Sequence, residues 1–175
     1  FLSITDWRDL WHGEGRFPFT PSVPDVMGVL AAAELLLATG TDVVLARHDR
    51  VARACRAGVH GMGLRMWPAS DDIAAASVTS IRVPDGITDI QVRDHARERY
   101  GVQLSAGQNA GNIIRIGHMG ATARPAYAIA GLAAVGQTLR DLGASVDLGA
   151  GLDAAMASLA GGTATDARTP ARVPA

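Results

Sequence analysis

The sequence predicts an α+β fold in which helices lie against a small, mostly antiparallel sheet. Between residues 62 and 143 the hydrophobic pattern switches between extended and helical periods in the order β-β-α-β-β-α. Two long helical segments separated by one glycine precede this region. The composition is that of a globular chain: 175 residues, 48% hydrophobic, 19% charged, with a net charge of −1. A chain of this length can build one hydrophobic core of ordinary size.

Charge and cysteine content exclude several classes of function. A near-neutral chain has no electrostatic footprint for nucleic acid or for an anionic membrane surface. The densest basic stretch, from Arg47 to Arg56, has helical spacing and predicts a solvated helix face. No segment reaches the ~18 uninterrupted apolar residues of a membrane span. The single cysteine, Cys55, cannot form an internal disulfide, which predicts a reducing, cytoplasmic compartment.

The first 40 residues predict a strand, a loop and two helices. Residues 1–4 (FLSI) read as a short strand, and Thr5 and Asp6 can cap a brief helix through residue 11. Residues 12–21 are rich in glycine and proline and predict an ordered loop. Ser22-Val-Pro-Asp25 has the form of a capping box, so we expect a helix from there to a stop at Gly40. These residues complete no core and begin at Phe1, so we expect the chain to be part of a longer protein.

A second helix is expected from residue 41, where Thr41 can act as the cap, to residue 62. Val51, Cys55 and Val59 recur at helical spacing and predict its buried face. Strands are predicted at 64–67, 77–83, 102–105 and 113–116. A capping box at Thr88–Gln91 opens a helix to residue 100. A last long helix is expected at 121–143. Residues 144–175 predict a poorly ordered, low-complexity tail, apart from a short helix near 150–160.

Arg115 is the residue that stands out chemically, because it interrupts a run of strand-forming isoleucines. An unpaired buried guanidinium costs several kcal/mol, so it needs an anionic partner or a wet face. The partner can be an Asp or Glu of this chain, or a ligand carboxylate held by two parallel hydrogen bonds. Gly117 and Gly120 follow it. They either let the chain approach a ligand closely or simply close the loop between a strand and a helix.

Other site chemistries find no support in the sequence. Cys55 reads as a small core residue on an apolar helix face. No hydrolase elbow or nucleotide-binding glycine loop is present. All 16 basic residues are arginine, so this chain supplies no lysine amine. Metal-ligand spacing is absent among the five histidines, which are His12, His48, His60, His95 and His118.

The segment "GNIIRIGHMG" resembles the C-terminal domain of class V aminotransferases. It is preceded by "ERYGVQLSAGQNAG" and followed by a long alanine-rich helix, as in that family. The resemblance is strongest to the alanine–glyoxylate and serine–pyruvate aminotransferase group, including pyridoxamine–pyruvate transaminase-like members. Upstream, "FPFTPSVPDVMGVLAAAELLLATG" and the helix containing "ARH" resemble the Thr-Pro segment and long helices of the same family. The resemblance runs from residue 1 to residue 143.

The resemblance implies the C-terminal part of a fold-type I transferase that depends on pyridoxal 5′-phosphate and works as a homodimer with sites at the subunit interface. Such enzymes move an amino group from a small amino acid (alanine- or serine-like) or pyridoxamine to a small 2-oxo acid (glyoxylate- or pyruvate-like). Residues 1–40 then end the cofactor-binding large domain, and residues 41–62 form an interdomain helix. Residues 63–143 form a small α+β sandwich domain, and 144–175 form the tail.

The resemblance also assigns three site residues. Arg115 resembles the arginine that binds the substrate α-carboxylate. Thr20 resembles the residue whose hydroxyl reaches the cofactor phosphate of the neighbouring subunit. Phe17 falls where some members place a tyrosine, although phenylalanine cannot donate that hydrogen bond. The lysine that forms the Schiff base with the cofactor is absent, so no catalytic residue is assigned and the chain alone is predicted to be inactive.

Two other functions remain open from the sequence. Within the same fold type, a lyase or cysteine desulfurase relative is an alternative, although the catalytic cysteine loop of that group is absent here. From a different class, the chain can be a non-enzymatic α+β ligand-binding or regulatory module with a pocket built around Arg115.

Overall fold

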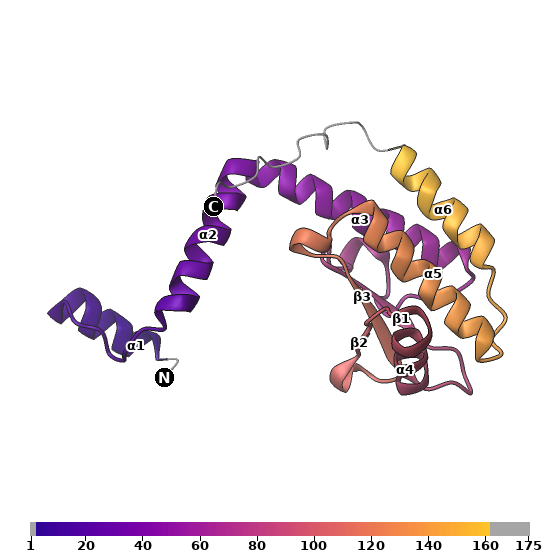
Figure 1. Ribbon diagram of the computed structural model, residues 1–175, viewed down its shortest axis with the longest axis horizontal. Coiled ribbons are helices and arrows are strands. Elements are labelled where there is room, and N and C mark those ends of the chain that lie inside the picture. The colour runs from indigo at the N-terminus through magenta and orange to yellow at the C-terminus, as the bar shows by residue number, and fades with distance from the viewer. Residues whose placement is uncertain (1–2, 162–175) are drawn as a thin grey trace. The chain divides into compact units, whose positions relative to one another are not determined.

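The computed structural model describes residues 3–161, and these fall into two compact units. The first unit runs to Thr41 and the second begins at Asp42. The sheet and helices α3 to α6 belong to the second unit (Figure 1).

The N-terminal unit begins with a helix and not with the predicted strand. Helix α1 spans Ile4–Trp7, and the Ser3 side chain caps it by accepting the Asp6 backbone N–H at 3.2 Å. The strand prediction is therefore wrong at residues 3–4, and residues 1–2 lie outside the described part. The cap is also Ser3, in place of the predicted Thr5 and Asp6, because a serine before the first turn satisfies its free N–H groups. A π-helical segment, η1, continues over Arg8–Glu14.

Helix α2 spans Val23–Thr39 and ends at Gly40, as predicted. The predicted capping box at its start does not form, since the Ser22 side chain makes no capping hydrogen bond. Pro24 near the first position fixes the backbone there instead, because its missing N–H needs no partner. No residue of α2 is buried.

Helix α3 spans Thr41–Gly61 and forms one wall of the core. The predicted apolar face is confirmed, because Val51, Cys55 and Val59 are fully buried. Thr41 is the first helical residue rather than a cap. Arg56 is only 7% exposed, so the prediction of a fully solvated basic face is wrong at this residue.

The sheet has three antiparallel strands in the order β1-β3-β2: β1 is Val78–Arg82, β2 is Ser105–Ala106 and β3 is Ile113–Gly117. The predicted strand at 64–67 is reduced to a single bridge between Met66 and Ile81. Proline follows at position 68, and a proline restricts the backbone of the residue before it. The predicted strand at 102–105 begins only at Ser105.

Two helices cover the sheet. Helix α4 spans Asp89–Tyr100 and has the predicted capping box, with both the Thr88 and Gln91 bonds formed. Helix α5 spans Pro125–Asp141, four residues later than predicted. A 3₁₀ turn, η4 (Gly120–Thr122), and the extended Arg124 before Pro125 take up the difference.

Helix α6 spans Leu148–Ala160, where the sequence allowed only a short helix in a poorly ordered tail. The helix expected near 150–160 is confirmed; it begins at Leu148 and is packed, because Gly151, Ala155 and Leu159 are buried. Residues 162–175 lie outside the described part. The contact between α3 and α6 depends on glycine: a Cβ on Gly61 would lie 2.7 Å from the Ala150 carbonyl oxygen. Small residues therefore let the two backbones approach closely.

The core lies between one face of the sheet and the helices. Ile81, Ile114 and Ile116 of the sheet pack in one cluster with Leu132 and Leu139 of α5. Among the described residues, no single helix is long and apolar enough to cross a membrane. The consecutive helices α2 and α3 meet that threshold only when taken together across their break.

Candidate functional site

Arg115 lies on the sheet face opposite the core. Its strand neighbours Ile114 and Ile116 are buried against the helices, whereas Arg115 is half-buried. In the register of the sheet, Arg115 is paired with Ser80 of β1 and with Ser105 of β2. A Ser–Arg–Ser row therefore crosses all three strands on one face, because cross-strand partners share a face.

The Arg115 guanidinium is anchored by the backbone and not by an acid. Its Nε donates to the carbonyl oxygen of Ala106 at 2.7 Å. Within residues 3–161, no Asp or Glu forms an ion pair with Arg115. The sequence left open whether Arg115 pairs with an Asp or Glu of this chain or with a ligand carboxylate. The described residues contain no such internal partner. The Nε bond fixes the direction of the guanidinium and leaves its terminal nitrogens for another acceptor.

Gly117 and Gly120 play different parts. Gly120 has φ of +58°, in the left-handed region that favours glycine, and opens the turn η4. Gly117 has no such φ. A Cβ placed on Gly117 would meet nothing closer than the Met119 methyl group, at 3.9 Å. Gly117 shares the face of Arg115, two residues away, so the space beside the guanidinium stays open.

His118 is completely buried at the end of β3. Its backbone N–H donates to the Ser77 carbonyl at 2.9 Å, and its Nε2 lies 2.8 Å from the hydroxyl of the buried Thr79. Burial lowers the pKa of His118 below its ordinary value, and the nearby Arg56 and His48 add to this. The backbone carbonyls of His118 and Ala76 oppose the shift. His118 is therefore a neutral side chain of the core.

His48 of α3 contacts the same turn. Its Nδ1 lies 2.7 Å from the Val44 carbonyl, and its Nε2 accepts the Gly120 backbone N–H at 2.9 Å. Spacing alone gives no signal for this contact, because residues 48 and 120 meet only in the folded chain.

Phe17 and Thr20 lie in the N-terminal unit. Phe17 stacks on Trp11 with ring centroids 4.5 Å apart and meets Trp7 edge-on at 5.9 Å. Thr20 is exposed in an irregular segment before α2. The contacts with the cofactor and its phosphate that the resemblance assigns to Phe17 and Thr20 stay predictions.

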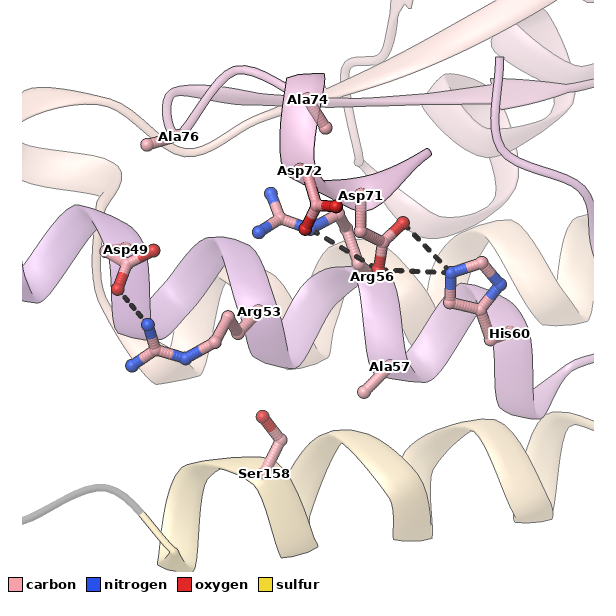
Figure 2. A pocket seen from close by; sticks show the side chains of 10 residues that line it. All are labelled: Asp49, Arg53, Arg56, Ala57, His60, Asp71, Asp72, Ala74, Ala76 and Ser158. Atoms are coloured by element: carbon pink, nitrogen blue, oxygen red, sulfur yellow. Dashed lines mark hydrogen bonds and ion pairs between the residues drawn. The ribbon is translucent and has the colours of Figure 1, made fainter. Parts of the chain in front are cut away.

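A cavity of about 600 Å³ lies beside α3 (Figure 2). Asp71 lies between two basic groups there, 3.8 Å from Arg56 Nε and 3.1 Å from His60 Nε2, and Arg53 pairs with Asp49. Positive and negative groups thus largely neutralise one another, and the charge selects no ligand class. The lining residues are Asp49, Arg53, Arg56, Ala57, His60, Asp71, Asp72, Ala74, Ala76 and Ser158.

A second cavity, of about 260 Å³, lies between β3 and α5 and includes Ile116, Gly117 and Tyr127. Arg115 lines neither cavity. In the described residues, no group of three or more His, Cys, Asp or Glu side chains is placed to hold a metal ion. Cys55 is fully buried, and burial raises the pKa of its thiol to about 11 although Thr79 and Arg56 oppose this. A thiol of that pKa is not a nucleophile at neutral pH.

The chain is similar to known aminotransferases over most of its length. No family model matches the chain. The pyridoxamine–pyruvate transaminase of Mesorhizobium japonicum is 47% identical over 158 residues, which are 89% of this chain and 40% of the relative. The L-aspartate–glyoxylate aminotransferase of Paracoccus denitrificans is 38% identical over 86% of this chain and 39% of the relative. The chain is a relative of the class V aminotransferases.

Solved structures agree with this assignment. The crystal structure of pyridoxamine–pyruvate aminotransferase from Mesorhizobium loti superposes with a TM-score of 0.84 at 46% identity, covering 91% of this chain and 41% of that one. Ureidoglycine–glyoxylate aminotransferase from Bacillus subtilis gives a TM-score of 0.76 at 28% identity, covering 88% of this chain and 40% of that one. The chain aligns with the C-terminal part of these aminotransferases and spans about 40% of the length of the relatives it matches. The predicted resemblance is thereby confirmed.

Proposed function

We propose that the chain carries the C-terminal portion of a pyridoxal-phosphate-dependent transaminase. The reaction moves an amino group from a small amino acid, alanine- or serine-like, or from pyridoxamine, to a small 2-oxo acid such as glyoxylate or pyruvate. One observation carries the proposal: Arg115 lies on an open sheet face, anchored through Nε and without a carboxylate partner in residues 3–161. The similarity to glyoxylate and pyruvate aminotransferases suggests the class of ligand, which is amino acids and 2-oxo acids.

Arg115 binds the carboxylate that amino acid and 2-oxo acid substrates share. A guanidinium presents a planar fork of donors that matches a carboxylate bidentately, and such charge-assisted bonds are stronger than neutral ones. The Nε bond to Ala106 fixes the fork before the ligand arrives, which lowers the entropy cost of binding. Ser80 and Ser105 are the cross-strand partners of Arg115, so this row of the sheet face is polar.

The residues of this chain fit pyridoxal phosphate only in part. The sequence holds no lysine, so the covalent anchor of the cofactor is not supplied here. Thr20 has an exposed hydroxyl suited to a phosphate oxygen, whereas Phe17 has no donor and packs on Trp11. The roles of these residues are therefore substrate binding and phosphate contact alone. A homodimer with Thr20 facing the neighbouring subunit, in the reducing cytoplasm, belongs to the same proposal.

A chimeric enzyme tests the proposal. The chain replaces the matching 40% of the Mesorhizobium japonicum transaminase, and the product is assayed with pyridoxamine and pyruvate. We expect turnover, and the substitution Arg115→Lys should raise KM for pyruvate roughly tenfold or more, because a point charge replaces a bidentate fork. Arg93→Lys, in an ion pair with Asp89 on α4, is the matched control and should leave KM unchanged.

Two results would contradict the proposal. A folded chimera that binds pyridoxal phosphate without turnover would favour the non-enzymatic ligand-binding module. An unchanged KM in Arg115→Lys would remove Arg115 from the substrate site. The chain by itself, mixed with pyridoxal phosphate, alanine and glyoxylate, should form no pyruvate above the rate of the free cofactor, because it lacks the lysine.

A further inference from the structure

The turn that follows β3 is held from two sides by histidines. His48 reaches it from α3, and its Nε2 lies 2.9 Å from the Gly120 backbone nitrogen. A backbone N–H can only donate, so Nε2 of His48 must be an acceptor and its proton must be on Nδ1. Nδ1 is 2.7 Å from the Val44 carbonyl, which accepts that proton. Both nitrogens are thus satisfied only in the neutral ring.

His118 holds the turn from the other side. It belongs to the core face of β3 with Ile114 and Ile116, and its Nε2 lies 2.8 Å from Thr79, the residue of β1 that pairs with Ile116. Its backbone N–H extends the ladder by one more bond to Ser77. The side chain therefore ties the end of β3 to a defined position on β1.

The position of Arg115 depends on this register. Alternate residues of a strand face opposite sides, so a slip of one residue would move Arg115 from the open face into the core. The β1–β3 pairing covers only five residue pairs, from Val78–Gly117 to Arg82–Ile113. Contacts at the Gly117 end thus matter for where the guanidinium points.

We propose that His48 and His118 are positioning residues for Arg115, and that they do this as a pair of neutral imidazoles that fix residues 117–120. His48 fixes the turn through the Gly120 amide, and His118 fixes the strand end through Thr79. We call the contacts of His48 with Gly120 and of His118 with Thr79 the histidine clamp. The ligand-binding role of Arg115 rests on the proposed function, whereas the clamp itself does not.

The charges near His118 disfavour its protonation. Arg56 of α3 faces His118 and carries a positive charge, and Cys55 of the same helix stays a neutral thiol beside Thr79. From β1 and the residue before it, the packed groups are the uncharged Thr79 and Ser77. Residues 117–122 add no titratable side chain apart from His118, and Arg47 and Asp49 flank His48 in the sequence.

The sign of the pH effect follows from the lowered pKa of His118. The unfolded chain takes up this proton at the ordinary histidine pKa of 6.5, whereas the folded chain resists it until a lower pH. The clamp therefore stabilises the fold above that value and loses its contribution as the pH falls below it.

Amide hydrogen exchange of the 175-residue chain, followed by NMR, tests the clamp. The exchange of the Gly120 amide, relative to an unstructured peptide, should be about three- to tenfold faster in His48→Leu, which removes the acceptor, than in the wild type, the value of one net hydrogen bond. His48→Gln keeps an acceptor and should retain the protection. His60→Gln, on the same helix, is the control and should behave like the wild type.

The link to Arg115 is read from the same samples. Exchange of the Arg115 Nε–H, bonded to Ala106, should accelerate in His48→Leu and recover in His48→Gln. Unchanged Gly120 exchange in His48→Leu overturns the clamp. Fast Gly120 exchange with an unaffected Arg115 Nε–H overturns the positioning role. Neither readout requires transaminase activity, so a failure here is distinct from an inactive chimera.

Discussion

Helices α2 and α5 are both 17 residues long, both rich in alanine and both opened by a proline, yet their environments differ. Helix α5 buries eight residues, among them Leu132 and Leu139, which are completely inaccessible. Helix α2 buries none, and its Leu37 is 73% exposed. The difference in burial follows from how the apolar residues are arranged around each helix rather than from their number. The apolar residues of α5 form one stripe that faces the sheet, whereas those of α2 lie all round the helix.

The comparison shows where the stability of the described chain lies. A helix without tertiary packing is marginal in water even when its residues favour helix, because nucleation is costly. Helix α5 is stabilised by burial against β3, α4 and α6, so its unfolding exposes the core of the second unit. Substitutions of the same type in the two helices should therefore have different consequences.

The largest contrast is expected for leucine truncation. Leu132→Ala should lower the free energy of unfolding by about 2–5 kcal/mol, because it removes buried methyl groups and leaves a cavity. Leu37→Ala in α2 should change it by less than about 0.5 kcal/mol, as exposed substitutions do. Urea denaturation followed by far-UV circular dichroism measures both. Equal destabilisation by the two variants would show that α2 is as deeply packed as α5.

Substitution of glycine by alanine should change stability in opposite directions in the two units. A Cβ on Gly151 of α6 would lie 2.8 Å from the Gly58 carbonyl oxygen of α3 and also clash with Met62, so Gly151→Ala should destabilise the second unit by about 1–3 kcal/mol. A Cβ on Gly28 of α2 meets nothing within 4 Å. Gly28→Ala should therefore raise the helicity and stabilise α2 by about 0.5–1 kcal/mol.

The same two techniques distinguish these outcomes. Helical signal in the native baseline reports on α2, and the urea midpoint reports on the second unit. A neutral Gly151→Ala would mean that α6 can shift away from α3 without loss, which contradicts the close packing of their backbones.

Local signals in the sequence predicted the elements whose ends are fixed by their own residues. The capping box Thr88–Gln91 and the stop at Gly40 are examples, because each is completed within a few residues. Strand lengths were harder to predict. Residues 64–67 have the apolar and aromatic character of a strand but lie at the sheet margin, where only Met66 forms a bridge.

The misses share a physical cause, which is contact between distant segments. The sequence predicted only a short helix near 150–160 within a low-complexity tail, since the alanines and glycines there carry no strong hydrophobic pattern. Their small size is what lets α6 pack against Gly58 and Gly61. In the site, Arg115 could be singled out from its own strand. Its neighbours Ser80 and Ser105, and the contact of His48 with Gly120, depend on register and on helix placement that spacing does not encode.

The smallest expected effect concerns acid stability, and it separates α5 from α2 once more. Asp141, at the end of α5, accepts hydrogen bonds from Tyr100, Gln137 and His95, which lower the pKa of its carboxyl to about 2 from 3.8. A depressed folded-state pKa stabilises the fold above the ordinary value, and this contribution is lost as the pH falls from about 4 to about 2. The group is exposed, so solvent screens the effect.

Asp141→Asn should flatten the decline of the urea midpoint with pH between about 4 and 2, relative to the wild type. Asp25→Asn, in the first turn of α2, is the matched control, because no side chain of a second helix is bonded to Asp25 in the described residues. An identical pH profile for Asp141→Asn and the wild type would show that the contacts from Tyr100 and His95 do not couple α4 to α5 in solution. A flatter pH dependence of the urea midpoint in Asp141→Asn but not in Asp25→Asn would place the acid-sensitive contact between α4 and α5.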